Sequence, residues 1–191
     1  KWHLEQLPSR ERPRRRVRDE NESDEQGPMD VSPQGRHNLF LPHAQGFDEY
    51  FCGTSSNYVA SHDLKGTPLR DAPDIVVDNR FRIDVQSEAA LSFIRRLAAQ
   101  PFCLYLAYFA PHVPLESPEP WFSRTRADLP LQRRQALAMI AAMDDGVGRI
   151  RSLLRKLKLE QETLIVFIGD NGAPLKDGAW NGSLNGPLVG E

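Results

Sequence analysis

The chain has 191 residues, a length that suits one globular domain, and 40% of them are hydrophobic while 26% are charged. The formal net charge of −2 gives no reason to expect a nucleic-acid partner. No apolar run is long enough to cross a bilayer, so the sequence predicts no membrane span. Cys52 and Cys103 are too few for a disulfide framework, and we expect both to be small buried residues.

Residues 9–25 form a dense block of charge, in which six arginines are followed by five acids. Such a stretch cannot bury apolar surface, and Pro28 and Pro33 discourage regular structure after it. We therefore predict that residues 5–34 are a charged insertion or disordered loop within a partial domain spanning 1–191. In the alternative interpretation the arginines bind a polyanionic substrate, but the adjacent acids would largely neutralise them.

The first helical pattern follows a polar loop region that begins after residue 50. We expect Asp84 to cap the helix at its start, and the helix to end before Pro101. The apolar face of this helix consists of Ala89, Ala90, Phe93, Ile94 and Leu97.

The apolar run 102–109 is typical of a strand buried on both faces, and the shorter run 164–168, rich in β-branched residues, is typical of a second strand. A long helix is expected between them, because apolar residues step by three and four along one face. These residues are Ile140, Met143, Val147, Ile150, Leu154 and Leu157. The order strand, helix, strand indicates a crossover between parallel strands, so we predict an α/β fold with a mainly parallel sheet flanked by helices.

Polar residues stand where each predicted strand ends, the edge at which ligands gather in parallel sheets. Asp170 and Asn171 offer hard oxygen ligands suited to Ca²⁺ or Mg²⁺, although a simple Asp-Asn-Gly turn would also explain them. His112, between Pro111 and Pro114, could donate to an anionic oxygen or protonate a leaving group. A structural or solvated histidine is the alternative.

Lys1 and His3 lie one residue apart, so their side chains would point to the same side of an extended segment. A cation and an imidazole on one face could clamp an oxyanion. A frayed chain end is the alternative interpretation of the same four residues.

Four short motifs, taken in this order, resemble the formylglycine-dependent sulfatase family. They are Lys-Trp-His-Leu at 1–4, Gly-Phe-Asp-Glu-Tyr at 46–50, Ala-Pro-His-Val-Pro at 110–114 and Gly-Asp-Asn-Gly at 169–172. Residues 141–148 and 185–188 resemble the family as well. One such motif is a weak signal, but four in the family's order are a specific one.

This resemblance implies a fold similar to alkaline phosphatase and a site built on a divalent cation, usually Ca²⁺ and otherwise Mg²⁺. It implies that Asp170 and Asn171 bind the metal and that Lys1 and His112 hold the sulfate oxygens. His3 would hydrogen-bond the hydroxyl of formylglycine, the modified cysteine that attacks sulfur, and would help to expel the sulfate.

The implied function is sulfuric ester hydrolysis, with a small-molecule or carbohydrate sulfate ester as substrate. Family habit implies a periplasmic, secreted or lysosomal protein. The alternatives are a phosphate or phosphonate ester hydrolase of the same superfamily, and a non-catalytic sulfatase-like remnant.

The sequence also departs from the family. The nucleophile motif, Cys/Ser-x-Pro-x-Arg, is absent from these residues, and neither Cys52 nor Cys103 fits it. Glu5 stands where the family has a glycine. We therefore expect the nucleophile in a segment upstream, and we expect no turnover from the isolated 191 residues.

Overall fold

The computed structural model describes residues 42–54, 56–69, 74–173 and 185. They belong to two compact units. We call residues 42–63 and 67–78 the strand unit, and residues 64–66 with those from 79 onward the helix unit. The predicted loop 5–34 lies outside the described residues, so it stays a prediction, as does the assignment of 1–191 to one partial domain.

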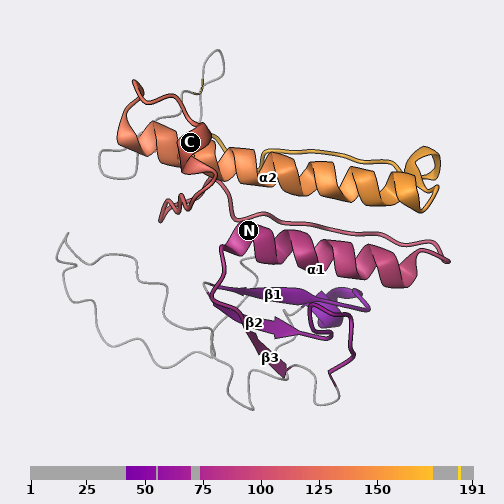
Figure 1. Ribbon diagram of the computed structural model, residues 1–191. Helices are drawn as coiled ribbons and strands as arrows, with labels where there is room; N and C mark the ends of the chain where they lie inside the picture. The colour runs from indigo at the N-terminus through magenta and orange to yellow at the C-terminus, as the bar shows by residue number, and fades with distance from the viewer. Residues whose placement is uncertain (1–41, 55, 70–73, 174–184, 186–191) are drawn as a thin grey trace, which may run out of the picture. The chain divides into compact units, whose positions relative to one another are not determined.

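The strand unit is a three-stranded antiparallel sheet in the order β1-β2-β3 (Figure 1). The strands are β1 (Phe51–Thr54), β2 (Asn57–Ala60) and β3 (Asp74–Val77). A short 3-10 helix, η2 (Pro42–Gln45), precedes them. Gly46 follows it with φ at 92°, a left-handed conformation that glycine adopts without a steric penalty.

The middle strand, β2, supplies the buried residues of this unit. Tyr58, Val59 and Ala60 are at most 6% exposed, and the Tyr58 ring stacks on Phe51 of β1 with 4.9 Å between centroids. The two rings are diagonal neighbours in the register, where Phe51 pairs with Ala60. The prediction of a polar loop after residue 50 is therefore wrong, because strands of four residues are too short to show a clear alternation.

In the helix unit, α1 (Arg82–Leu97) matches the first predicted helix and ends before Pro101 as expected. The predicted cap at Asp84 is wrong. Phe81 is the capping residue, without a side-chain hydrogen bond, and Asp84 lies in the first turn, where the helix dipole favours an acid. The helix buries Ile83, among other residues, against the second helix.

The long helix, α2 (Leu131–Lys156), is confirmed, but it begins earlier than its apolar stripe predicted. Its buried face is also different, since Leu154 is the one member of the predicted stripe that is fully buried. Small residues are buried on this face, with Ala138, Ala142 and Gly146 spaced four apart. A side-chain carbon on Gly146 would overlap the oxygens of Ser87 and Tyr108, so this glycine lets the two helices approach.

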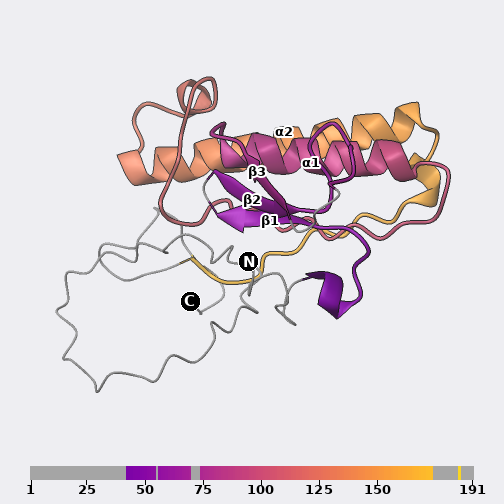
Figure 2. The same ribbon diagram turned by 90° about the horizontal axis from the view of Figure 1, so that it is seen from below.

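The two helices run alongside each other in the same direction, which both views show (Figures 1 and 2). Ile83 near the start of α1 packs on Met139 and Ala142 of α2, in a core that includes Trp121. Two short 3-10 helices, η3 (Phe122–Arg124) and η4 (Glu160–Glu162), lie before and after α2. No helix in the described part of the chain is both long and apolar enough to span a membrane.

The segment 102–109 is extended and runs back along α1, but it is not part of a sheet among the described residues. Gln86 of α1 takes the place of a strand partner. Its side-chain amide donates to the Ala107 carbonyl at 3.1 Å and accepts from the Phe109 N–H at 3.3 Å. Phe102 meets Phe93 edge to face at 5.7 Å, farther along the helix.

The segment 164–168 is also extended without a strand partner among the described residues. Its five apolar residues are between 49% and 88% exposed. In the segment 102–109 the prediction of burial on both faces is wrong, since Cys103 and Tyr105 are exposed. Cys52 is half-buried, so the expectation of two buried cysteines is also wrong. A strand is defined by hydrogen bonds to a neighbour, and an apolar run cannot supply that neighbour itself.

The directions of the two extended segments nevertheless agree with the predicted crossover. Figure 1 shows 101–109 and 163–173 running the same way, each opposite to the helix before it. Extended segment, helix and parallel extended segment is the arrangement of a crossover unit. The carboxyl ends of both segments therefore point to one side of the helix unit.

Candidate functional site

His112 lies in a turn at the carboxyl end of the first extended segment, where the sequence places it. Its backbone N–H donates to the Phe109 carbonyl at 3.0 Å, which closes the turn. The imidazole contacts the Phe109 ring at 5.2 Å between centroids, and its Nδ1 lies against the Val113 carbonyl. When Nδ1 donates its hydrogen to this carbonyl, the neutral ring carries no hydrogen on Nε2. Nε2 can then donate to an anion only in the protonated imidazolium.

The turn is attached to α1 through Phe109. The Arg82 guanidinium lies over the Phe109 ring at 3.7 Å from its centroid, and Arg82 is 7% exposed. Gln86, one helical turn later, holds the main chain of residues 107 and 109. Sequence reasoning missed both residues, because polar side chains on an amphipathic helix are usually read as its solvent face.

Beside Phe109, the Tyr108 hydroxyl lies 2.8 Å from the Ser87 hydroxyl, which itself donates to the Ile83 carbonyl at 2.8 Å. Burial raises the pKa of Tyr108 further above its ordinary value, although the Ser87 hydrogen bond opposes this. Tyr108 therefore keeps its proton at neutral pH and is the donor to Ser87. Nearby, burial also raises the pKa of Asp84, against the attraction of Arg149.

Asp170 and Asn171 lie at the carboxyl end of the second extended segment, and both are exposed. The Asn171 amide donates to the Asp170 carboxylate at 3.2 Å. The chain just beyond them is held by Asn185, whose amide accepts from the Ala173 N–H at 2.7 Å and donates to the Ala173 carbonyl at 2.9 Å. Sequence reasoning noted the motif at 185–188 only as a resemblance and gave this asparagine no role.

A calcium or magnesium site needs six or more oxygen ligands, some of which can be water. The carboxylate of Asp170 and the amide oxygen of Asn171 fit such an ion by their chemistry. Among the described residues, no group of three or more His, Cys, Asp or Glu side chains gathers around a point that could hold a metal. The metal-binding role of the Asp170–Asn171 pair therefore stays a prediction, and the predicted anion-binding residues Lys1 and His3 lie outside the described residues.

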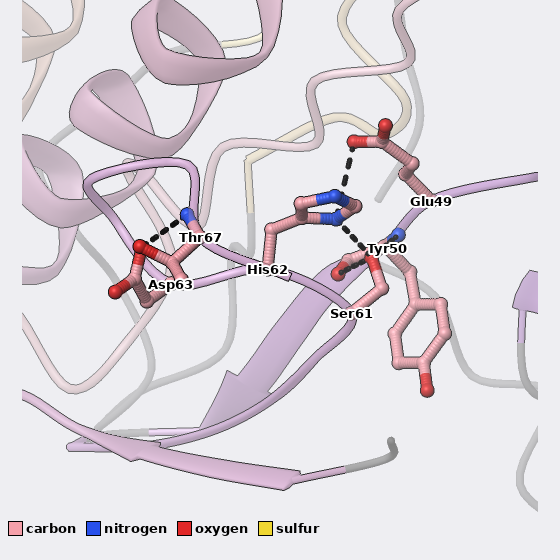
Figure 3. Close-up of polar contacts among 6 residues, drawn as sticks. All are labelled: Glu49, Tyr50, Ser61, His62, Asp63 and Thr67. Atoms are coloured by element: carbon pink, nitrogen blue, oxygen red, sulfur yellow. Dashed lines mark hydrogen bonds and ion pairs between the residues drawn. The ribbon is translucent and has the colours of Figure 1, made fainter. Parts of the chain in front are cut away.

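The strand unit contains a second polar cluster, which Figure 3 shows and sequence reasoning missed. The Ser61 hydroxyl lies 3.1 Å from Nδ1 of His62, and the Glu49 carboxylate lies 3.5 Å from the same nitrogen. In a catalytic triad the nucleophile and the acid contact different ring nitrogens, whereas here both Ser61 and Glu49 contact Nδ1. The Ser61 hydroxyl also accepts from the Tyr50 N–H at 3.0 Å and lies 3.2 Å from its carbonyl, so the cluster fastens two chain segments together.

Comparisons with known proteins identify the family. A family model described as Sulfatase matches residues 21–189, and the chain belongs to the sulfatase family. The N-acetylgalactosamine-6-sulfatase of Homo sapiens is 30% identical over 171 residues, which cover 81% of this chain and 31% of that protein. The uncharacterized sulfatase YdeN of Escherichia coli (strain K12) is 32% identical over 142 residues, or 69% of this chain and 24% of that protein.

Among solved structures, Ps i-CgsB in complex with k-i-k-neocarrahexaose resembles the chain with a TM-score of 0.63 and 27% identity. The match covers 80% of this chain and 38% of that one. These comparisons confirm the predicted class: the chain is a partial α/β domain with an alkaline phosphatase-like fold. It spans about a third of the length of the N-acetylgalactosamine-6-sulfatases, 31% in the human protein.

Proposed function

We propose that this chain is the part of a sulfuric ester hydrolase that supplies some of its sulfate-binding and metal-binding residues. The observation that carries the proposal is the common direction of the two extended segments, whose carboxyl ends bear His112 and the Asp170–Asn171 pair (Figure 1). Membership of the sulfatase family supports the reaction type. The chain contributes to this activity together with the residues that complete the site.

In the proposed reaction, His112 donates a hydrogen bond from Nε2 to a sulfate oxygen, and Lys1 contributes a second cationic donor. His3 would hydrogen-bond the hydroxyl of a formylglycine nucleophile and would assist the departure of the sulfate. Asp170 and Asn171 would hold a divalent cation, Ca²⁺ or Mg²⁺, and that cation would neutralise charge on the sulfate oxygens. Fixed donors around the transferring group lower the barrier mainly by positioning and by electrostatic stabilisation.

The substrate class that the comparisons support is a carbohydrate sulfate ester. One relative is by name an N-acetylgalactosamine-6-sulfatase, and one structural neighbour was solved with an oligosaccharide. A periplasmic, secreted or lysosomal location accords with the family resemblance. Phosphate or phosphonate ester hydrolysis is the second candidate, since related metal sites serve several reaction types, but the comparisons do not favour it.

The test is an assay of the intact protein that contains these residues, with aryl sulfate and aryl phosphate as paired substrates. We expect kcat/KM to be higher for the sulfate ester, and we expect chelation of divalent cations to abolish that activity. The isolated 191 residues serve as the control and should give no turnover with either ester, because they lack the nucleophile motif. Preference for the phosphate ester would contradict the proposal, as would hydrolysis by the isolated chain.

A further inference from the structure

Arg82 stands in an unusual place for a charged residue. It lies in the first turn of α1, where the helix dipole disfavours a cation, and it is 7% exposed. Removing a guanidinium from water is costly unless it gains compensating contacts. The Glu116 carboxylate lies 3.8 Å from the Arg82 guanidinium, too far for a hydrogen bond. The Nε of Arg82 has no hydrogen-bond partner among the described residues.

Arg82 also makes an aromatic contact. Its guanidinium carbon lies 3.7 Å from the centroid of the Phe109 ring, well within the range of a cation–π interaction. Phe109 in turn touches the His112 imidazole, with 5.2 Å between ring centroids, and its carbonyl accepts the His112 backbone N–H at 3.0 Å. One phenylalanine therefore connects a buried cation to both the ring and the backbone of the histidine.

Gln86 holds the same phenylalanine from another direction. It follows Arg82 by four residues, so both side chains lie on one face of α1. Its amide fixes the main chain on either side of Tyr108, while Arg82 covers the aromatic ring of Phe109. Together Arg82 and Gln86 restrict the orientation of the Phe109 ring. The His112 imidazole packs on this ring and is restricted in the same way.

We propose that Arg82 is a positioning residue that sets the orientation of the His112 imidazole through the Phe109 ring. The catalytic consequence rests on the proposed function, in which His112 binds the sulfate. A side chain that orients a binding residue acts on geometry, and a displacement of about 1 Å at a reacting centre can cost up to roughly 100-fold in rate. A merely structural Arg82 would instead change the stability of the protein and leave the His112 ring as it is.

The test uses the intact protein with isotopically labelled histidine and the variants Arg82→Met, His112→Asn and the double variant. The His112 ring signals are assigned by their absence in His112→Asn. We expect Arg82→Met to shift these signals and to lower kcat/KM for an aryl sulfate by about tenfold. In the His112→Asn background the same substitution should add little further loss, because its effect passes through the missing ring.

The matched control is Arg95→Met, an exposed arginine in the last turn of the same helix, which should match the parent protein in both readouts. Arg82→Lys keeps a cation but loses the planar face of the guanidinium. The ring signals and kcat/KM are measured on this variant if Arg82→Met does not fold. Unchanged His112 signals in the Arg82 variant would overturn the proposal, as would activity losses that multiply in the double variant. Full activity of His112→Asn would instead refute the proposed role of His112, and the ring signals would still decide whether Arg82 orients it.

Discussion

Replacing His112 by asparagine in the intact protein is expected to lower kcat/KM for an aryl sulfate by roughly 10²- to 10³-fold. Asparagine can still donate a hydrogen bond, but it carries no positive charge and cannot transfer a proton. Steady-state kinetics of the variant and the parent protein with an aryl sulfate measure this loss.

His62 provides the control, because the same substitution there changes another described histidine. Its contacts with Ser61 and Glu49 indicate a structural role, so His62→Asn should keep kcat/KM within about twofold, the range of a change outside the site. If His112→Asn is as active as His62→Asn, then His112 takes no part in binding sulfate. The family would still be the sulfatases, but the assignment of this histidine would be wrong.

The second large effect concerns stability, and the α1–α2 contact predicts it. Gly146→Ala should lower the free energy of unfolding by about 1–3 kcal/mol, the usual range for overpacking a tight contact. The added carbon would overlap the Ser87 and Tyr108 oxygens, which are hydrogen-bonded to each other at 2.8 Å. Either the helices separate or that hydrogen bond breaks.

Gly148→Ala is the matched variant two residues farther along α2. A side-chain carbon there meets no atom within 4 Å, so the change should stabilise the protein by about 0.5–1 kcal/mol through helix propensity alone. Thermal or denaturant unfolding of the two variants, measured in parallel, gives the comparison. Equal stabilisation by both alanines would mean that the helices are not in close contact at Gly146.

The helices were predictable because their signal is local and periodic. The spacing of Ile140, Met143 and Leu154 indicated α2 correctly, although it did not identify the buried face. That face depends on Ala142 and Gly146, whose small side chains carry almost no hydrophobic signal and matter only because another helix lies against them. A contact between two helices cannot be read from the periodicity of one of them.

Strands were less predictable, because each depends on a partner elsewhere in the chain. The apolar runs 102–109 and 164–168 are extended as expected, but the described residues supply neither with a paired neighbour. The short strands β1 to β3 pair with one another although their sequences show no clear alternation. An apolar run indicates an extended segment better than it indicates a sheet.

The candidate site was predictable where it follows a motif. His112, Asp170 and Asn171 stand at segment ends, and the resemblance to sulfatases singled them out. Arg82 and Asn185 act through contacts with residues distant in sequence, which no motif records. For Arg82 one signal was present, since an arginine in the first turn of a helix opposes the dipole and calls for a specific partner.

The central claim is that residues far apart along this chain meet around one cation and one anion. A crystal structure of the intact protein, grown with Ca²⁺ and inorganic sulfate, measures this most directly. We expect one sulfate ion within hydrogen-bonding distance of the His112 imidazole, and next to it a cation coordinated by Asp170 and Asn171. Finding His112 and Asp170 at opposite sides of the domain, with no shared ion between them, would contradict the account.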